Sequence, residues 1–562
     1  MKGSIEIEYA FNTEKEGWQH IDWAKANRTV KLLQARIVKA WREGKHRKAK
    51  SLQWILTHSY SAKVLAVRRV TENSGKKTAG VDGKVWSKPN EKWDASKSLN
   101  RKNYKASPLR RVHIPKSNGK KRPLGIPTMR DRAMQALYLQ ALEPISETTA
   151  DNYSFGFRSY RSCADAIQLA FFVLSQKHSA EWILEADIEG CFDNIDHNWI
   201  LQNIPLDKHM LKQWLKAGVI DNQSLFPTTK GTPQGGIISP VLANMVLDGL
   251  ETKVYRSVGV GYDKNERKSG RGMKVNFIRY ADDFVITGKN PEILMKKIQP
   301  VVEEFLKERG LRLSKEKTRI THIDQGFDFL GKNIRRYEGK LLIKPSKGSI
   351  KNVKKKIYHT IKSNRTIKTE NLIRRLNPII RGWANYHKHM VSSKVFSKID
   401  NDIFWMLWSW ALRRHPQKGK RWVKRKYFKT LCKRNWVFAG KSKEGKMVPL
   451  FYMHQVKIER YVKIKRGANP FDPEWEPYFE KRLDRIMRSS LKGYNLLRRI
   501  WKSQNGICPV CKTKITKETK WHTHHIEPKV FGGSDKFNNL VMLHPDCHRQ
   551  VHSLNLKVVK PC

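Results

Sequence analysis

The sequence predicts an α+β protein built from several domains. Residues 1–95 have the pattern of basic helices, residues 105–340 alternate strand-like and helix-like segments, and helical spacing returns from about residue 350. A short unit rich in Cys and His ends the chain. At about 150 residues per domain, 562 residues correspond to three or four domains. The hydrophobic content of 39% excludes a wholly disordered basic tail.

The chain is strongly basic. It carries 111 Lys and Arg against 51 Asp and Glu, which gives a formal net charge of +60. Because self-repulsion of this size opposes compaction, we expect nucleic acid as the partner. The longest apolar run, residues 403–412, is too short to span a bilayer, and the N-terminus lacks the apolar core of a signal peptide. We therefore expect a cytoplasmic, ribonucleoprotein-associated protein that is neither secreted nor bound to a membrane.

The sequence predicts N-terminal helices with buried tryptophans, followed by a pair of strands. The N-terminal helices are expected to place Trp18, Trp23, Trp41 and Trp54 on apolar faces, and a Gly-rich break follows at residues 74–83. Residues 109–127 have the pattern of two strands around a turn at Asn118-Gly119.

Two further segments place acidic residues at the ends of apolar strands. Residues 181–192 contain a short strand that ends in an acidic turn at Asp187. Residues 274–288 contain two strands joined at Ala281-Asp282-Asp283. The middle part is therefore expected to be α+β.

The third part is helical and basic. One apolar stripe has helical spacing over residues 372–383 and a second over residues 396–410. These stripes consist of Leu372, Leu376, Ile379 and Trp383, and of Phe396, Ile399, Ile403, Leu407 and Trp410. Six cations then alternate with aromatic residues, as is typical of nucleic-acid binding. They are Lys418, Lys420, Arg421, Lys424, Arg425 and Lys426.

The acidic strand ends suggest a metal-dependent reaction. Nucleotidyl transfer uses two divalent cations about 3.5–4 Å apart, and hard cations prefer carboxylate oxygens. Asp187, Asp282 and Asp283 would repel one another if they lay side by side, unless cations were held between them. The structural alternative is simple turn chemistry for the Asp-Asp pair and a helix cap or surface turn for Asp187.

Seven segments resemble the boxes of reverse transcriptases, in the order of that family. YADD (280–283) resembles the active-site box, DIEGCFDNIDH (187–197) its partner, and TPQGGIISPVLANM (232–245) the box beneath template and primer. The remaining four are RPLGIPTMRDRAMQ (122–135), SFGFRSYRSCADAI (154–167), LRLSKEKTRI (311–320) and FDFLG (327–331). The resemblance implies a right-hand polymerase with fingers and palm, and two Mg²⁺ ions held by Asp187, Asp282 and Asp283.

The resemblance also implies a nucleotide pocket. Phe192 would crowd the 2′ position of the sugar and so favour deoxynucleotides, the alternative being a core aromatic. Gln234 and Gly235 would line the pocket.

Three cations near that pocket are assigned to the triphosphate on the same resemblance. Lys116 and Arg122 would clamp it, and Lys317 would help neutralise or protonate the pyrophosphate leaving group. General contact with an RNA backbone is the alternative for all three.

The flanking segments narrow the resemblance to bacterial group II intron-encoded proteins. Residues 63–83 resemble their N-terminal extension, and residues 374–416 resemble their thumb, called domain X or the maturase domain. The family implies that the protein assists splicing of a group II intron, remains bound to the lariat RNA, and copies the intron into target DNA from dNTPs. Arg, Lys and Trp residues of the thumb would bind the RNA.

Two Cys/His pairs in the C-terminal unit have the spacing of a structural zinc site. They are Cys508 and Cys511, and His544 and Cys547. The alternative is a set of unligated Cys residues.

The segment between and after these pairs resembles the HNH endonuclease motif, a ββα-metal fold. The resemblance implies His525 as general base, His524, His548 and His552 as ligands of a divalent metal, and Asn539, or less favourably Asn538, as the residue that orients the base. His548 and His552 are one helical turn apart and share a face. A structural finger is the alternative.

These expectations give five domains. They are an N-terminal extension at 1–95, fingers and palm at 96–345, the thumb at 346–450, a basic DNA-binding segment at 451–498, and the HNH unit at 499–562. The predicted function joins RNA-directed DNA polymerase, splicing maturase and site-specific endonuclease in target-primed reverse transcription and retrohoming. The alternatives are a splicing-only maturase with a decayed polymerase and a repair or defence nuclease. The sequence leaves the oligomeric state open.

Overall fold

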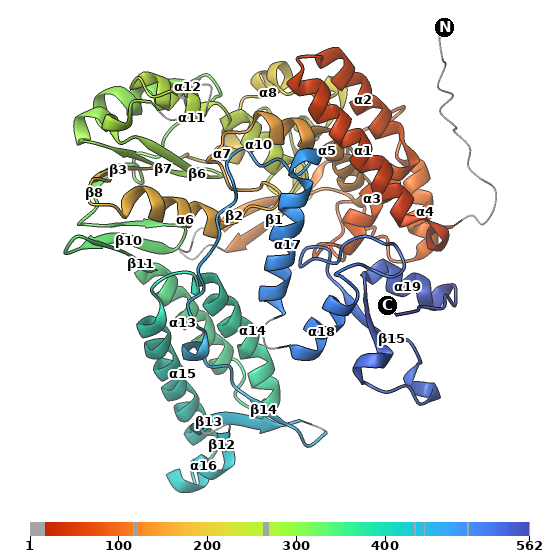
Figure 1. The fold of residues 1–562 in the computed structure, drawn as a ribbon, viewed down its shortest axis with the longest axis vertical. Helices are drawn as coiled ribbons and strands as arrows, with labels where there is room; N and C mark the ends of the chain where they lie inside the picture. The colour runs from red at the N-terminus through yellow and green to blue at the C-terminus, as the bar shows by residue number, and fades with distance from the viewer. Residues whose placement is uncertain are drawn as a thin grey trace.

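The computed structural model describes residues 17–115, 119, 121–261, 269–431, 434–442, 444–491 and 494–560. Figure 1 shows an N-terminal group of helices beside an α+β body, a helical bundle below that body, and a C-terminal unit next to the N-terminal helices. Within the described residues, no helix is both long enough and apolar enough to cross a membrane. The predicted α+β multidomain class is confirmed.

The N-terminal helices pack on one long helix of the central body. Buried glutamines fasten this contact: Gln34 donates to the Gln140 carbonyl over 2.9 Å and Gln53 to the Ala141 carbonyl over 3.1 Å. These helices are α1 (Trp23–Arg42), α2 (His46–His58), α3 (Tyr60–Glu72) and α4 (Pro89–Ser98), packed on α5 (Met129–Thr149).

The tryptophans of this region do not all behave as predicted. Trp18 and Trp23 are buried and Trp41 is half-buried. The expectation is wrong for Trp54, which is 54% exposed. Its ring stacks on His58 at 4.2 Å, so a neighbouring ring on the same helix takes the place of a core contact.

The strands predicted around residues 109–127 are present. They form an antiparallel pair in a sheet of order β2-β1-β4-β5, with Arg110 opposite Ile126. The turn residues 116–118 lie outside the described residues. The strands are β1 (Leu109–Pro115), β2 (Lys121–Ile126), β4 (Val219–Asp221) and β5 (Ser224–Phe226).

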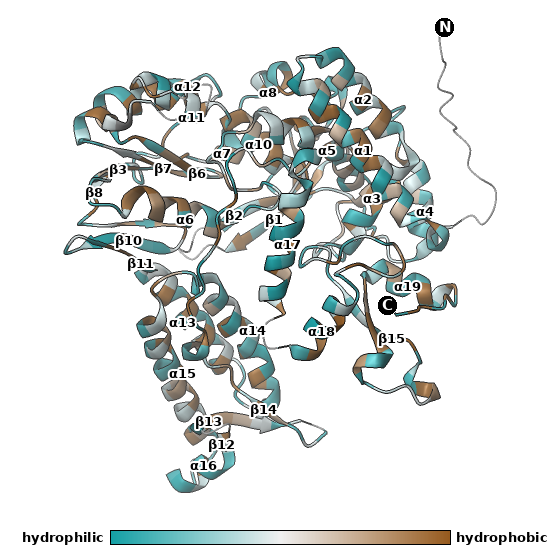
Figure 2. Ribbon diagram, viewed as in Figure 1, coloured by the Kyte–Doolittle hydropathy of each residue, from teal (hydrophilic) through white to brown (hydrophobic). Residues whose placement is uncertain are grey.

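The second sheet carries the acidic strand ends. Its order is β6-β7-β3-β8 with antiparallel neighbours. Side chains alternate between its faces: Phe277 and Phe284 belong to one core cluster, and Ile278 and Val285 to another. Figures 1 and 2 show these apolar strands between α6 and the pair α11 and α12. The elements are β3 (Trp182–Asp187), β6 (Asn276–Tyr280), β7 (Asp283–Gly288), β8 (Arg319–His322), α6 (Cys163–Leu174), α11 (Leu250–Ser257) and α12 (Gln299–Lys307).

Shorter elements complete the central body. A three-stranded sheet of order β11-β10-β9 leads from the body into the helical bundle. These elements are α7 (Cys191–Asn194), α8 (His197–Asn203), α9 (Lys208–Leu215), α10 (Ser239–Leu247), β9 (Phe327–Phe329), β10 (Lys332–Tyr337) and β11 (Lys340–Pro345).

The predicted helical part is a bundle with its own core. All five residues of the 396–410 stripe are buried, as expected. In the 372–383 stripe, Leu372 and Leu376 are buried, but Ile380 and Ala384 take the core positions that were assigned to Ile379 and Trp383. The elements are α13 (Lys347–Lys362), α14 (Thr369–His387), α15 (Ser393–Arg414), α16 (Lys420–Tyr427), β12 (Phe428–Leu431), β13 (Arg434–Lys441) and β14 (Met447–Pro449).

A C-terminal strap, residues 456–475, returns from the bundle to the central body. Asp165, fully buried, accepts hydrogen bonds from the Ile464 backbone nitrogen (2.7 Å), the Tyr461 hydroxyl (2.8 Å) and the Arg482 guanidinium (3.0 Å). The strap leads into α17 (Glu476–Ser490) and then α18 (Asn495–Ser503).

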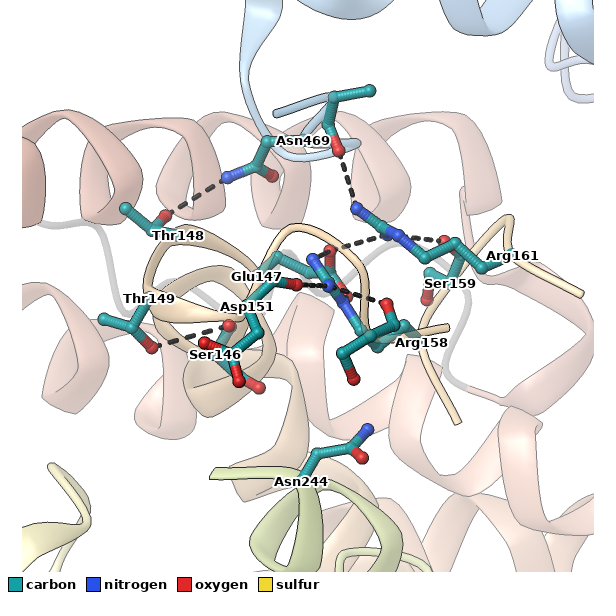
Figure 3. A network of polar contacts seen from close by, with 12 residues as sticks. Ser146, Glu147, Thr148, Thr149, Asp151, Arg158, Ser159, Arg161, Asn244 and Asn469 are labelled. Carbon is teal, nitrogen blue, oxygen red and sulfur yellow. Dashed lines mark hydrogen bonds and ion pairs between the residues drawn. The ribbon is translucent and has the colours of Figure 1, made fainter. Parts of the chain in front are cut away.

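A second polar network holds the strap, as Figure 3 shows. Arg158 and Arg161 both bind the Glu147 carboxylate, and Arg161 also donates to the Ala468 carbonyl over 2.9 Å. Asn469 donates to Thr148 over 3.1 Å. The box SFGFRSYRS therefore fixes the strap to the body.

The C-terminal unit consists of a two-stranded sheet and a helix. The elements are β15 (His522–His525), β16 (Leu540–Leu543) and α19 (Pro545–Ser553). Helix α19 lies against the N-terminal helices. Asp546 is 2.6 Å from Arg68, and Arg549 is 2.9 Å from Glu72. Gln550 donates to the Ile21 carbonyl over 3.0 Å.

Candidate metal centres and nucleic-acid interface

The three predicted carboxylates converge at one end of the β3–β7 pair. Asp187 ends β3 and lies directly opposite Asp283, the first residue of β7. Asp282 occupies the tight turn between β6 and β7, where Ala281 has a φ of 58°. The antiparallel register therefore brings together residues that are almost one hundred positions apart.

The electrostatics of this cluster fit a divalent cation. Although Asp283 reaches solvent, its pKa is raised to about 7 by desolvation within the surrounding protein, by a hydrogen bond with Asp187 and by the charge of Asp282. Desolvation and the charge of Asp187 also raise the pKa of Asp282. Lys317 Nζ lies 2.7 Å from Asp187 Oδ2 and balances part of this charge. The ligand atoms of the three carboxylates do not all lie within 4.8 Å of one another, so the cluster is more open than the two C-terminal Cys/His clusters. Mg²⁺ would offset the repulsion between these hard oxygen donors.

We expect the affinity of this cluster for Mg²⁺ to rise with pH up to about 7 and then to level off. Below that pH a proton on Asp283 competes with the cation, so the affinity is expected to fall by up to about tenfold per pH unit. Calorimetric Mg²⁺ titrations of the full chain between pH 6 and 8 measure this. Asp324→Asn, at an exposed acid outside the cluster, is the control, and an affinity that does not change with pH would contradict the assignment.

Two of the predicted nucleotide-binding residues, Phe192 and Gln234, contact other side chains of the central body. Phe192 on α7 is half-buried and packs edge to face on Phe157, with ring centroids 6.0 Å apart. Gln234 donates to both carboxylate oxygens of Asp193 over 3.2 Å. The structure thus links the two boxes that supply Phe192 and Gln234.

Glycine is required at two positions of this region. A Cβ atom on Gly235, whose φ is 124°, would lie 2.5 Å from the Gly125 carbonyl oxygen. A Cβ atom on Gly156 would lie 2.4 Å from the Ala281 backbone nitrogen. Gly156 was not among the predicted site residues, although it supports the turn that holds Asp282. Its only sequence signal was its place in the SFGF box.

The three cations assigned to the triphosphate have different positions. Arg122 is exposed on β2, and its charge offsets part of the rise that desolvation causes in the pKa of Asp282. Lys317 is bonded to Asp187. Lys116 lies outside the described residues.

The two Cys/His pairs form a compact buried site. Their ligand atoms all lie within 4.8 Å of one another, and each residue is at most 5% exposed. Nε2 of His544 lies 3.1 Å from the carbonyl oxygen of Lys514. This contact fixes the orientation of the imidazole ring. Three sulfur ligands and one imidazole in a closed site match structural zinc.

We expect Cys508→Ala to remove one zinc ion per chain and to unfold the C-terminal unit. The binding energy of a structural zinc site, about 10–16 kcal/mol, contributes directly to folding. Elemental analysis and limited proteolysis would report the loss, with Lys517→Ala as the exposed control. Normal zinc content in Cys508→Ala would exclude Cys508 as a ligand.

A histidine cluster lies beside the zinc site. His524, His548 and His552 place ligand atoms within 4.8 Å of one another. Burial and the neighbouring His552 and His524 lower the pKa of His548 to about 4, so this ring is neutral, the form that binds metals. The structure brings together His524, His548 and His552, the three residues predicted to bind the divalent metal of the HNH unit.

The partner of His525 differs from the expected one. Its Nε2 lies 2.7 Å from Asp535 Oδ1, and Lys529 Nζ lies 2.8 Å from Asp535 Oδ2. The Asn539 side chain instead accepts from the Glu527 backbone nitrogen (2.7 Å) and donates to the Ser534 carbonyl (2.9 Å). Asn539 therefore holds the loop that carries Asp535, and the sequence analysis missed Asp535.

Four family models match the chain in succession. Residues 18–99 match the N-terminal domain of reverse transcriptase, and residues 114–334 match reverse transcriptase (RNA-dependent DNA polymerase). Residues 350–428 match the maturase-specific domain of group II introns, and residues 508–554 match HNH endonuclease. The chain is 33% identical to the group II intron-encoded protein LtrA of Lactococcus lactis over 293 residues, which are 42% of this chain and 48% of LtrA.

The chain belongs to the group II intron reverse transcriptase/maturase family, to which it adds an HNH domain. It is also 36% identical to protein YkfC of Escherichia coli over 257 residues, which are 41% of this chain and 67% of YkfC. Maturase-like protein 1 of Euglena gracilis is 26% identical over 387 residues, 66% of this chain and 78% of that protein. The chain spans about half the length of LtrA. Reverse transcriptases and HNH endonucleases use divalent metals, which agrees with the donor sets described above.

In this group II intron family member, the predicted basic segment forms an exposed surface of the maturase-specific domain. Its six cations lie on or just before α16, and all six are exposed. Lys424 Nζ lies 4.4 Å from the Trp436 ring centroid and Lys426 Nζ lies 4.6 Å from that of Trp422. Figure 2 shows α16 as a hydrophilic helix at the tip of the bundle. Alternating cations and aromatic rings suit phosphate contact and base stacking.

Proposed function

We propose that this chain is a multifunctional group II intron protein that acts in target-primed reverse transcription and intron retrohoming. It would polymerise DNA on an RNA template, assist intron splicing and nick a specific DNA site. The main support is the convergence of Asp187, Asp282 and Asp283 at one strand pair in a chain that also carries maturase-specific and HNH domains. Its partners would be a group II intron lariat RNA, the target DNA and dNTPs.

We propose the division into domains at 1–95, 96–345, 346–450, 451–498 and 499–562. The start of α13 at Lys347 supports the second boundary, between residues 345 and 346. The last boundary falls inside α18, whose Ile500 and Trp501 are buried and whose C-cap residue Gln504 bonds to Met542 of β16. The HNH unit is therefore better begun at Asn495.

In the polymerase centre, each side chain has a distinct role. Asp187, Asp282 and Asp283 would hold two Mg²⁺ ions, which supply the Lewis acidity that activates the primer 3′-hydroxyl and stabilises the leaving oxygen. Phe192 would exclude a 2′-hydroxyl, and Gln234 and Gly235 would contact the incoming nucleotide.

Cations around this centre would bind the triphosphate. Arg122 and Lys116 would hold its oxygens. Lys317, whose Nζ lies 2.7 Å from Asp187, would help neutralise or protonate the pyrophosphate leaving group.

In the nuclease centre, His525 would accept a proton from the attacking water. The contact with Asp535 favours the His525 tautomer that carries its hydrogen on Nε2, so His525 would take the proton at Nδ1. The Asp535 carboxylate would then stabilise the imidazolium form of His525. His524, His548 and His552 would hold a divalent metal that stabilises charge on the scissile phosphate. Asn539 would position His525 indirectly, by fixing the Asp535 loop. Cys508, Cys511, His544 and Cys547 would hold structural Zn²⁺.

Primer extension on an RNA template with Mg²⁺, combined with splicing of the intron that flanks this reading frame, tests the proposal. Synthesis and stimulated splicing together support it. Stimulated splicing without DNA synthesis would support the alternative, a splicing-only maturase with a decayed polymerase, against which the converged carboxylates argue.

We expect neutralisation of the α16 cations to weaken RNA binding and to flatten its salt dependence. Replacing Lys420, Arg421, Lys424 and Arg425 with Gln should reduce the log–log salt slope by up to about 0.7–0.9 for each phosphate that the protein no longer neutralises. Filter binding of the intron RNA between 50 and 300 mM salt measures this slope. The control set is Lys296→Gln and Lys297→Gln, outside the bundle, and an unchanged slope in the α16 variant would place this helix away from RNA.

A further inference from the structure

One loop of the HNH unit exposes two large apolar side chains. Val530 is 90% exposed and Phe531 is 76% exposed. Among the exposed large hydrophobic side chains in the described part of the chain, Val530 is the most exposed, and Val559 alone equals Phe531. We call Val530 and Phe531 the apolar tip.

The loop that carries the apolar tip is closed at its base. Asn539 accepts from the Glu527 nitrogen and donates to the carbonyls of Glu527 and Ser534, over distances of 2.7–3.0 Å. A Cβ atom on Gly533 would overlap the Glu527 carbonyl, so the two sides of the loop are in direct contact.

The turn at the tip is also hydrogen-bonded. The Phe531 nitrogen donates to the Pro528 carbonyl over 2.9 Å, and the Gly532 nitrogen donates to the Lys529 carbonyl over 3.1 Å. The loop therefore has little freedom to fold its apolar side chains back onto the protein.

The apolar tip is tied to the proposed general base. Lys529, which directly precedes Val530, pairs with the same Asp535 carboxylate that binds His525. Lys529, Val530 and Phe531 form one 3-10 turn, so the apolar tip stays close to the contacts that join Lys529, Asp535 and His525. A phosphate attacked near His525 would therefore place neighbouring base steps within reach of Phe531.

Two exposed lysines beside the tip could contact phosphates, although the acidic Glu527 and Asp535 lie in the same loop and Asp535 pairs with Lys529. The Lys529 side chain is 59% exposed, and Lys536 on the other side of the loop is exposed as well. Proteins that bend duplex DNA insert Phe, Leu, Ile or Met between base steps and contact the adjacent phosphates with cations.

We propose that Phe531, supported by Val530, inserts between base pairs of the duplex next to the nicking site and positions the scissile phosphate. This rests on the proposed nuclease function. Burial of the aromatic ring between bases offsets the cost of unstacking them, and the resulting kink turns the backbone toward the metal cluster. Phe531 is thus a positioning residue for the nuclease reaction.

The test uses the full chain bound to its intron RNA and a duplex that spans the ligated exons. We expect Phe531→Ala to nick the intact duplex at least about tenfold more slowly than the wild type. An abasic site at the step next to the nick should restore most of the rate, because the unstacking cost has been removed. Phe172→Ala and Val559→Ala, at apolar residues of comparable exposure, should nick normally.

A second readout does not depend on cleavage. 2-Aminopurine placed in the duplex within three steps of the nick should brighten when wild-type protein binds, and should stay quenched with Phe531→Ala. Unchanged zinc content and normal primer extension would show that the variant is folded.

Three outcomes exclude the insertion, and two others reassign the tip or separate the insertion from the proposed nuclease function. Normal nicking by Phe531→Ala, a slow rate that the abasic site does not restore, or undiminished 2-aminopurine fluorescence would exclude insertion. A defect confined to association with the intron RNA would assign the tip to RNA instead. If the wild type brightens the probe but does not nick, the nuclease function fails while the insertion stands.

Discussion

Replacing Asp282 with Ala is expected to lower DNA synthesis by about a thousandfold or more. Asp282 lies in the turn between β6 and β7, beside the β3–β7 pair that brings Asp187 and Asp283 together, and its loss would remove one of the three carboxylates that would hold the Mg²⁺ ions. Stabilisation of transition-state charge by metals amounts to several kcal/mol, and each 1.36 kcal/mol corresponds to about tenfold in rate. Primer extension on an annealed RNA template with Mg²⁺ measures the effect.

The effect of Asp282→Ala on the other two activities distinguishes a local defect from misfolding. Asp282→Ala should retain nicking and most of the splicing activity, because the HNH and maturase-specific domains have their own cores or metal sites. Asp324→Asn is the matched control at an exposed acid. Loss of all three activities in Asp282→Ala would indicate misfolding, and retained synthesis would show that the assignment is wrong.

Replacing His525 with Ala is expected to reduce DNA nicking by about two to four orders of magnitude, the usual contribution of a general base. Extension of an annealed primer should be unchanged, because the change removes no group near the carboxylate cluster. Nicking of the ligated-exon duplex by the RNA-bound protein measures the loss. His209→Ala, at an exposed histidine of α9, is the control.

The neighbour of His525 sharpens this experiment. Asp535→Asn keeps the size of the side chain but removes the charge that stabilises the imidazolium. It should therefore nick more slowly than the wild type and faster than His525→Ala. Full nicking activity in His525→Ala would move the role of base to another residue.

Local patterns predicted much of the candidate sites. Short apolar runs and turn signals marked β1, β2, β3, β6 and β7, and the strand ends put Asp187 and the Asp282-Asp283 pair where they were expected. The spacing of the two Cys/His pairs predicted one C-terminal cluster, and the resemblance to the HNH motif predicted the histidine cluster. These features depend on residues close together in sequence.

Contacts between distant residues were not predictable in this way. Nothing around Asp165 signals that it accepts from Ile464 and Arg482, some three hundred positions away. Asp535 and Ile380 were missed for a related reason. Several neighbouring positions satisfy the same spacing, and only tertiary packing selects one of them.

The docking of α19 on the first helices has a consequence for synthesis of the protein. Asp546 and Gln550 leave the ribosome long after Arg68 and Ile21, the residues that they bind. The HNH unit can therefore dock on the N-terminal helices only after the polymerase and the helical bundle have been synthesised. A chain that terminates within the bundle lacks the HNH unit and exposes the surface of α3 on which α19 would dock. A deletion of α1, α2 and α3 would likewise release the nuclease from the rest of the enzyme.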